Sequence, residues 1–218
     1  MKIKKYDTII FDLDGTLLDT LEDLKDSVNY AMAFYGFPER SLEEVRTFVG
    51  NGVGRLIELA IPEGADNPLY KKCLKTFKDH YSQNMQNKTA PYSGIMETLR
   101  ELKDRGYKLA VVSNKFDAAV KALVRDYFGD YIDVAAGESD NVSRKPAPDT
   151  VLKALAELGS VPEKAVYVGD SEVDAMTARN SNLTFIGVTW GFRTREILEE
   201  QGAKTIIDEP GQLLSVLE

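Results

Sequence analysis

Two aspartates stand at the end of the first apolar run in the chain. In the stretch DTIIFDLDGTLLDT, residues 9–11 lead directly into Asp12, and Asp14 follows before Gly15. Two carboxylates so close together repel one another, and burying either of them without a partner costs free energy. Because Asp-Gly is a common turn dipeptide, the pair could simply lie in a hydrated turn. The alternative is that a cation is bound beside them.

Further polar groups accompany two later apolar runs. They are Ser113, Asn114 and Lys115 after YKLAVV, and Asp170 and Asp174 in the segment KAVYVGDSEVD. Between these runs, SRKPAPD carries Lys145, and the following Pro146 favours extended backbone there. These residue types include metal ligands, hydrogen-bond donors and a cation, so the chain holds the components of a binding or catalytic site.

Each of these groups, taken alone, also has a structural explanation. Ser113 and Asn114 could cap the next helix. Ser171 and Asp174 have the spacing of a capping box, in which case Asp174 only completes a helix end. Lys145 could be one more solvated charge. The elements that carry these residues must decide between the two interpretations.

Strands and helices alternate from Pro91 onward. Apolar strands are predicted at 107–113, 132–137, 164–170, 183–189 and 204–208. Helices are predicted over 94–106, after Asp117, over 148–159, after Ser171 and over 194–200, with a last helical turn near the end. Such repeated units predict a parallel sheet that is covered on both faces, with right-handed crossovers. Residues 9–11 have no other strand to pair with and must join this sheet.

The segment between Thr20 and Lys88 shows helical periodicity only. One helix is expected from Leu21 until Gly36 and Pro38, and others from Ser41, after Gly52 and over about 68–85. This segment therefore interrupts the chain between the first strand and the rest of the sheet. The sequence predicts an α/β core of residues 1–15 and 90–218, with an inserted α-helical cap of residues 16–89.

All the polar groups named above fall at the carboxyl ends of the predicted strands, where open α/β sheets bind ligands. Together they make chemical sense as a phosphoryl-transfer site. Asp12 and Asp170 offer the hard oxygen ligands that suit Mg²⁺. Lys145, the Ser113 hydroxyl and backbone amides could bind a phosphate. One carboxylate could attack phosphorus to give an acyl phosphate, and a second could serve as general acid and then as base.

Composition narrows the class of protein. The 218 residues are 43% hydrophobic and 28% charged, as in ordinary soluble proteins. A net charge of −8 argues against a general nucleic-acid surface, which needs a basic footprint. Cys73 is the only cysteine, so no internal disulfide can form. No run approaches the roughly 20 apolar residues of a membrane span, and MKIKKYD lacks signal-peptide features. We expect a cytoplasmic protein without membrane partners.

Four segments, FDLDGTLLDT, VVSNK, RKPAPD and VGDSEVDAMTARN, resemble in this order the four motifs of the haloacid dehalogenase-like hydrolase superfamily. The resemblance implies a Rossmann-like core with a small α-helical cap. It implies that Asp12 is the nucleophile and Asp14 the general acid/base. It also implies a Mg²⁺ ion held by the Asp12 and Asp170 side chains and the Asp14 backbone carbonyl, with Asp174 in support.

The same resemblance implies that Ser113 and Lys145 bind the phosphoryl group, assisted by the Asn114 amide. Asp14 argues against true haloacid dehalogenases, which lack an aspartate at this position because a halide leaving group needs no acid. A non-catalytic phosphate-binding regulatory module would be expected to lack at least one of Asp12, Asp14, Lys145 and Asp170, and all four are present.

Two other segments, TFVGNGVGRLIELA and WGFRTREILEEQGAKTIID, look like the corresponding parts of phosphoglycolate phosphatases. This resemblance implies that Gly50, Asn51, Gly52 and Arg55 lie near the leaving group of the substrate, with Arg55 binding a substrate anion. We interpret Trp190 and Phe192, outside the four motifs, as packing residues.

The expected function is that of a Mg²⁺-dependent phosphatase that acts on a small phosphorylated metabolite through an aspartyl-phosphate intermediate, as a monomer or homodimer. A pyrophosphatase and a phosphosugar phosphatase or mutase share most of these features and stay open as alternatives.

Overall fold

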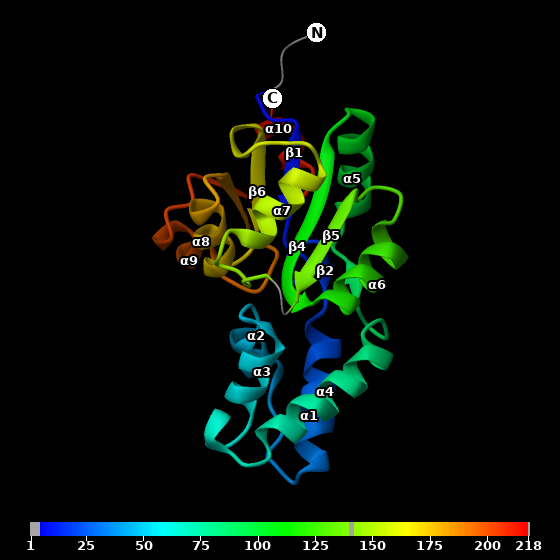
Figure 1. The fold of residues 1–218 in the computed structure, drawn as a ribbon, viewed down its shortest axis with the longest axis vertical. Coiled ribbons are helices and arrows are strands. Elements are labelled where there is room, and N and C mark those ends of the chain that lie inside the picture. Colours follow the sequence, from blue (N-terminus) through cyan, green and yellow to red (C-terminus); the bar gives the residue numbers. More distant parts are fainter. Residues whose placement is uncertain (1–4, 140–141, 218) are drawn as a thin grey trace. The chain divides into compact units, whose positions relative to one another are not determined.

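A six-stranded parallel sheet forms the centre of the larger of two compact units, which comprises residues up to Leu18 and from Pro91 onward. Its strands are β1 (Thr8–Phe11), β4 (Lys108–Phe116), β5 (Val134–Glu138), β6 (Ala165–Gly169), β7 (Thr184–Val188) and β8 (Thr205–Ile207). They lie in the order β5-β4-β1-β6-β7-β8. Figure 1 labels the neighbouring strands β5, β4, β1 and β6. The computed structural model describes residues 5–139 and 142–217, so residues 1–4, 140, 141 and 218 of the predicted core lie outside the described part.

The first strand lies in the middle of this sheet. Ile10 of β1 is opposite Ala110 of β4 on one side and opposite Tyr167 of β6 on the other. Ile9 and Ile10 are completely buried, which explains why β1 is apolar without alternation: both faces of the sheet are covered. The prediction that β1 joins the later strands is confirmed. Strand order reverses beside β1, since β4 and β5 extend to one side and β6, β7 and β8 to the other.

Helices pack on both faces of the sheet. They are α5 (Ile95–Asp104), α6 (Asp117–Phe128), α7 (Asp149–Glu157), α8 (Glu172–Asn180), α9 (Arg195–Glu200) and α10 (Gln212–Val216), with a short 3₁₀ turn at Pro162–Lys164. Residues of α7 and α8 share one hydrophobic cluster with Ile10 and Tyr167. Phe11 and Val168 follow Ile10 and Tyr167 along their strands, so their side chains point to the opposite face of the sheet. On that face, residues of α5 and α10 line a small space beside Phe11 and Val168. The predicted α/β fold with a doubly covered parallel sheet is confirmed.

Strand β4 is longer than the sequence predicts. The expected strand ends at Ser113, whereas β4 continues to Phe116 through an irregularity in its pairing with β5. The next helix, α6, begins at Asp117 without a side-chain cap. The explanation of Ser113 and Asn114 as helix caps is therefore wrong, because both residues lie inside the strand.

The smaller compact unit spans Asp19–Ala90 and is built from helices. They are α1 (Leu21–Phe34), α2 (Leu42–Phe48), α3 (Gly52–Ala60) and α4 (Tyr70–Asn84), with a 3₁₀ turn at Gly64–Asp66. Helix α2 begins with a capping box formed by Ser41 and Glu44. Two-residue strands β2 (Leu18–Asp19) and β3 (Ala90–Pro91) pair with each other where the chain passes between the units.

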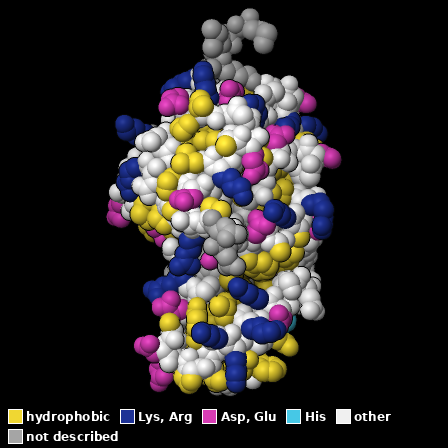
Figure 2. Space-filling view, viewed as in Figure 1, with side chains coloured by type: hydrophobic (Ala, Val, Ile, Leu, Met, Phe, Trp, Pro, Cys, Tyr) yellow, Lys and Arg dark blue, Asp and Glu magenta, His cyan; other side chains and the backbone are white. Residues whose placement is uncertain are grey.

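The surface carries both signs of charge. Figure 2 shows lysine and arginine side chains interspersed with aspartate and glutamate on the visible face, and the whole chain has a net charge of −8. Within the described ranges, none of the helices combines the length and the apolar character needed to cross a membrane.

Candidate active site

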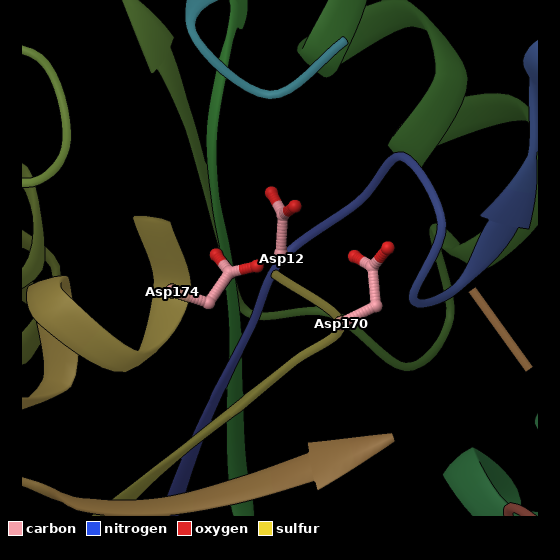
Figure 3. Close-up of side chains that lie close together, drawn as sticks. All are labelled: Asp12, Asp170 and Asp174. Carbon is pink, nitrogen blue, oxygen red and sulfur yellow. The ribbon is translucent and has the colours of Figure 1, made fainter. Parts of the chain in front are cut away.

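Three buried carboxylates converge at the carboxyl end of the sheet. Asp12 follows β1, Asp170 follows β6, and Asp174 lies in the first turn of α8. One carboxylate oxygen from each residue lies within 4.8 Å of the others. Figure 3 shows Asp12 and Asp170 pointing to the same side and Asp174 reaching toward Asp12. Neighbouring strands β1 and β6 bring these residues together at the reversal of strand order, where ligands bind in open α/β sheets.

A buried lysine joins two of these acids. The Lys145 Nζ atom donates to Asp12 Oδ1 and to Asp174 Oδ1, each at 2.8 Å, and the lysine side chain is 3% exposed. Asn114 Nδ2 donates to the Lys145 backbone oxygen at 3.0 Å and so holds the segment that carries the lysine. The explanation of Lys145 as a solvated charge is wrong, because its ammonium group is buried among carboxylates.

The shared burial of these charges shifts their pKa values. Burial raises the pKa of Asp12 to about 7, with a further rise from Asp174 and an opposing effect of Lys145. Burial also raises the pKa of Asp170 well above its usual range, and the neighbouring Asp174 and Asp12 add to that rise. Burial lowers the pKa of Lys145, but Asp12 and Asp174 outweigh it, so the net pKa is raised. Lys145 contacts two of the three carboxylates, so one ammonium group cannot compensate all three acids when they are ionised.

Asp174 has two structural roles at once. Its Oδ2 atom accepts hydrogen bonds from Ser171 Oγ at 2.6 Å and from the Ser171 backbone N at 3.1 Å, which completes a capping box on α8. Its Oδ1 atom accepts from Lys145. The capping explanation is confirmed but incomplete, because one carboxylate can cap a helix with one oxygen and join the acid cluster with the other.

Asp14 has a charged partner, Lys115, that sequence reasoning did not assign to it. Lys115 Nζ contacts Asp14 Oδ1 at 2.8 Å and Oδ2 at 2.9 Å, and the lysine side chain is 2% exposed. Ser113, two positions earlier in β4, is also buried, and its hydroxyl accepts from the Lys115 backbone N at 3.3 Å. The only signal for Lys115 in the sequence is its place at the end of the strand beside Ser113.

Tyr167 is a further member of the site that sequence reasoning missed. Its hydroxyl accepts from Lys145 Nζ at 3.0 Å and lies 3.1 Å from Asp174 Oδ1 and 3.3 Å from the Val112 carbonyl oxygen, to either of which it can donate. Burial raises the pKa of this phenol well above its usual range. A single phenol in the otherwise apolar strand AVYVG was the available signal.

The remaining predicted site residues belong to the helical unit. Gly50, Asn51 and Gly52 lie at the start of α3, and both glycines have positive φ, 121° and 80°. Arg55, in the first turn of α3, pairs through Nη1 with Glu58 Oε1 at 2.5 Å, and its side chain is 46% exposed. The predicted contact of these residues with a leaving group stays a prediction.

The acid cluster has the chemistry of a site for a hard divalent cation. All its potential ligands are carboxylate oxygens, which Mg²⁺ and Ca²⁺ prefer over softer metals. Burial raises the pKa values of Asp12 and Asp170, and repulsion from neighbouring carboxylates adds to the rise. A bound cation would supply positive charge beside these carboxylates, so the residues present fit a metal of this kind.

The chain is similar in sequence to a known family of hydrolases and to individual phosphatases. The model of the haloacid dehalogenase-like hydrolase family matches residues 9–188. A phosphoglycolate phosphatase of Mesorhizobium japonicum is 33% identical over 202 residues, which cover 91% of this chain and 89% of that protein. A phosphoglycolate phosphatase of Aquifex aeolicus is 34% identical over 185 residues, covering 84% of this chain and 85% of its own length.

Solved structures show the same fold. A crystal structure from Lactobacillus delbrueckii subsp. bulgaricus, described provisionally as a phosphoglycolate phosphatase, has a TM-score of 0.92 at 37% identity and covers 98% of both chains. CbbY from Rhodobacter sphaeroides, crystallised in complex with phosphate, has a TM-score of 0.80 at 30% identity, covering 97% of this chain and 99% of its own.

Proposed function

Because the chain belongs to the haloacid dehalogenase-like hydrolase family, we propose that it is a Mg²⁺-dependent phosphatase for a small phosphate monoester. The similarity to phosphoglycolate phosphatases makes 2-phosphoglycolate the first substrate to test. The observation that carries the proposal is the buried cluster in which Lys145 bridges Asp12 and Asp174 at 2.8 Å each. Such a cluster combines a nucleophile, metal ligands and a cation for the phosphoryl group at the place where this fold binds ligands.

The reaction has two steps. An oxygen of Asp12 attacks phosphorus and forms an aspartyl phosphate, while the bond from phosphorus to the leaving oxygen breaks. Asp14 gives a proton to that oxygen. A water molecule then attacks the aspartyl phosphate and loses a proton to the Asp14 carboxylate, which releases phosphate and restores Asp12. Lys145 and Ser113 contact the phosphoryl oxygens, and Asn114 supports Lys145 through its backbone oxygen.

The metal would be held by the Asp12 and Asp170 side chains and the Asp14 backbone carbonyl, with Asp174 supporting it. When bound, Mg²⁺ neutralises negative charge on the carboxylates and on the phosphoryl group. Asp174 suits a supporting position, because its Oδ1 atom accepts from Lys145, which also contacts Asp12, and its Oδ2 atom accepts from Ser171 at the start of α8.

The helical unit would confer substrate selection. We propose that residues 16–89 act as a cap over a core of residues 1–15 and 90–218, with Gly50, Asn51 and Gly52 beside the leaving group. Arg55 would then exchange its partner Glu58 for an anionic group of the substrate. We further propose that the protein works in the cytoplasm as a monomer or homodimer.

The first test is phosphate release from a panel of small phosphates, with and without Mg²⁺. The panel contains 2-phosphoglycolate, sugar phosphates, nucleotides and pyrophosphate. We expect Mg²⁺-dependent turnover with preference for 2-phosphoglycolate, and loss of turnover when EDTA removes divalent metal. Preference for pyrophosphate or a sugar phosphate would keep the chemistry and change the substrate. Activity that survives complete removal of metal would contradict the Mg²⁺ assignment.

Replacing Asp14 with asparagine tests the acid role. An amide cannot protonate the leaving oxygen, so turnover of an alkyl phosphate should fall by about 100-fold to 10,000-fold, the usual contribution of a general acid. The leaving oxygen of an activated aryl phosphate such as 4-nitrophenyl phosphate depends less on protonation. The rate of leaving-group release from this substrate should therefore fall much less in the variant. Single-turnover measurement of leaving-group release compares the two substrates. Equal losses for both would count against Asp14 as the acid.

A further inference from the structure

The loop that follows β7 contacts Asp170 directly. The Phe192 backbone N donates to Asp170 Oδ2 at 2.7 Å, and Thr16 Oγ1 donates to Asp170 Oδ1 at 3.1 Å. Both carboxylate oxygens are therefore held, from two loops that are far apart in the sequence. The interpretation of Phe192 as a packing residue is correct for its buried ring but omits its N–H group.

Close approach of the backbone at Gly191 restricts Asp170 further. An ideal Cβ atom on Gly191 would lie 2.3 Å from Asp170 Cβ, 2.5 Å from Asp170 Oδ2 and 2.3 Å from the Gly15 carbonyl oxygen. These distances are far below van der Waals contact, so any side chain at position 191 must displace the Asp170 side chain or the loop after β1 that contains Gly15. Gly191 is not among the residues with positive φ, and steric contact is the reason that glycine is needed there.

Two more contacts fix the loop to its surroundings. Trp190 Nε1 donates to the Thr16 carbonyl oxygen at 2.9 Å, and Thr16 is the residue whose hydroxyl binds Asp170. At the other end, Arg193 Nε donates to Glu172 Oε2 at 2.9 Å, at the start of α8. The loop that follows β7 is thus attached to the loop that follows β1, to Asp170 and to helix α8, which carries Asp174.

We propose that Trp190, Gly191 and Phe192 form a positioning element, the Asp170 clamp, which fixes the Asp170 carboxylate in the orientation that binds metal. This inference rests on the metal site of the proposed function. Residues that orient a metal ligand without touching the ion commonly change metal affinity by about 10-fold to 100-fold when they are replaced. The clamp residues follow β7 and lie outside the four sequence motifs, so their contribution arises from tertiary contact.

The test compares Gly191→Ala with Gly211→Ala. Gly211 also has ordinary φ, and a Cβ atom there would meet nothing within 4 Å, so the same chemical change is made without a clash. Mg²⁺ is titrated into each metal-free, full-length chain by isothermal titration calorimetry, without substrate. We expect Gly191→Ala to weaken Mg²⁺ binding by about 10-fold or more and Gly211→Ala to leave it unchanged. Thermal unfolding in EDTA is measured beside it, since a purely structural role would lower stability without changing the affinity of the folded chain.

A second variant keeps the inference testable if Gly191→Ala does not fold. Trp190→Phe removes the indole donor to Thr16 while keeping an aromatic side chain, and it is expected to weaken Mg²⁺ binding severalfold. Unchanged affinity in the folded Gly191→Ala chain, or in Trp190→Phe if the first variant does not fold, would overturn the clamp and leave the proposed function intact. Failure of the unaltered chain to bind Mg²⁺ would remove the metal site of the proposed function, and the clamp with it.

Discussion

Asp12→Asn will abolish phosphate release while the chain remains folded. The carboxylate that attacks phosphorus becomes an amide, which is not a nucleophile, so turnover of the best substrate should fall by at least about 1,000-fold. Phosphate release at saturating substrate and Mg²⁺ measures the loss, and circular dichroism measures the fold. A folded variant with normal activity would exclude Asp12 as the nucleophile.

The same variant should be more stable than the unaltered chain when metal is absent. Asp12 has a pKa of about 7 in the folded chain, against about 3.8 as its ordinary value. Between these two values the folded state binds more protons than the unfolded state, so stability falls as pH rises through that range. Asparagine does not titrate, so the variant avoids this loss of stability, and its side-chain oxygen can still accept a hydrogen bond from Lys145. We expect a gain of roughly 1–3 kcal/mol at pH 8 and a flatter pH profile, measured by urea unfolding in EDTA.

The second large effect is expected from Lys145→Met. This change removes the ammonium group that Asp12 and Asp174 share and leaves both buried carboxylates without this partner. Removing one partner of a buried ion pair destabilises proteins by about 3–5 kcal/mol, because the remaining charge is unpaired. We expect a loss of this size at neutral pH in EDTA, together with the loss of measurable phosphatase activity.

Lys121→Met is the matched control for this change. Lys121 pairs with Asp117 at 2.6 Å, but its side chain is 62% exposed, and pairs of that kind contribute less than about 1 kcal/mol. The double variant Asp12→Asn with Lys145→Met completes the test. It should be less destabilised than Lys145→Met alone, because one of the unpaired carboxylates is gone. If Lys145→Met were as stable as the control, the ammonium group would not be compensating the acids.

Much of the fold could be predicted from local pattern. Apolar runs separated by helical periodicity indicated a parallel sheet, and the position of residues 9–11 ahead of a helical segment required the chain to return to β1. The convergence of Asp12 and Asp170 followed from the same pattern, because parallel strands end at one edge of their sheet. Residue type and order along the chain were sufficient for these conclusions, since each depends on periodicity or on a rule of sheet topology.

The partners of these residues were decided only by the tertiary structure. Lys115 lies 101 positions from Asp14, and Phe192 lies 22 positions from Asp170, yet each forms a direct contact. No local pattern specifies such pairs. They depend on the register of β1 against its neighbours, on the extra length of β4 and on the close approach of a loop at Gly191. The sequence by itself determined that Asp12, Asp170 and Lys145 meet at the sheet edge. Packing between distant segments determined which oxygen each donor contacts, because hydrogen bonds require atomic positions that only the assembled core fixes.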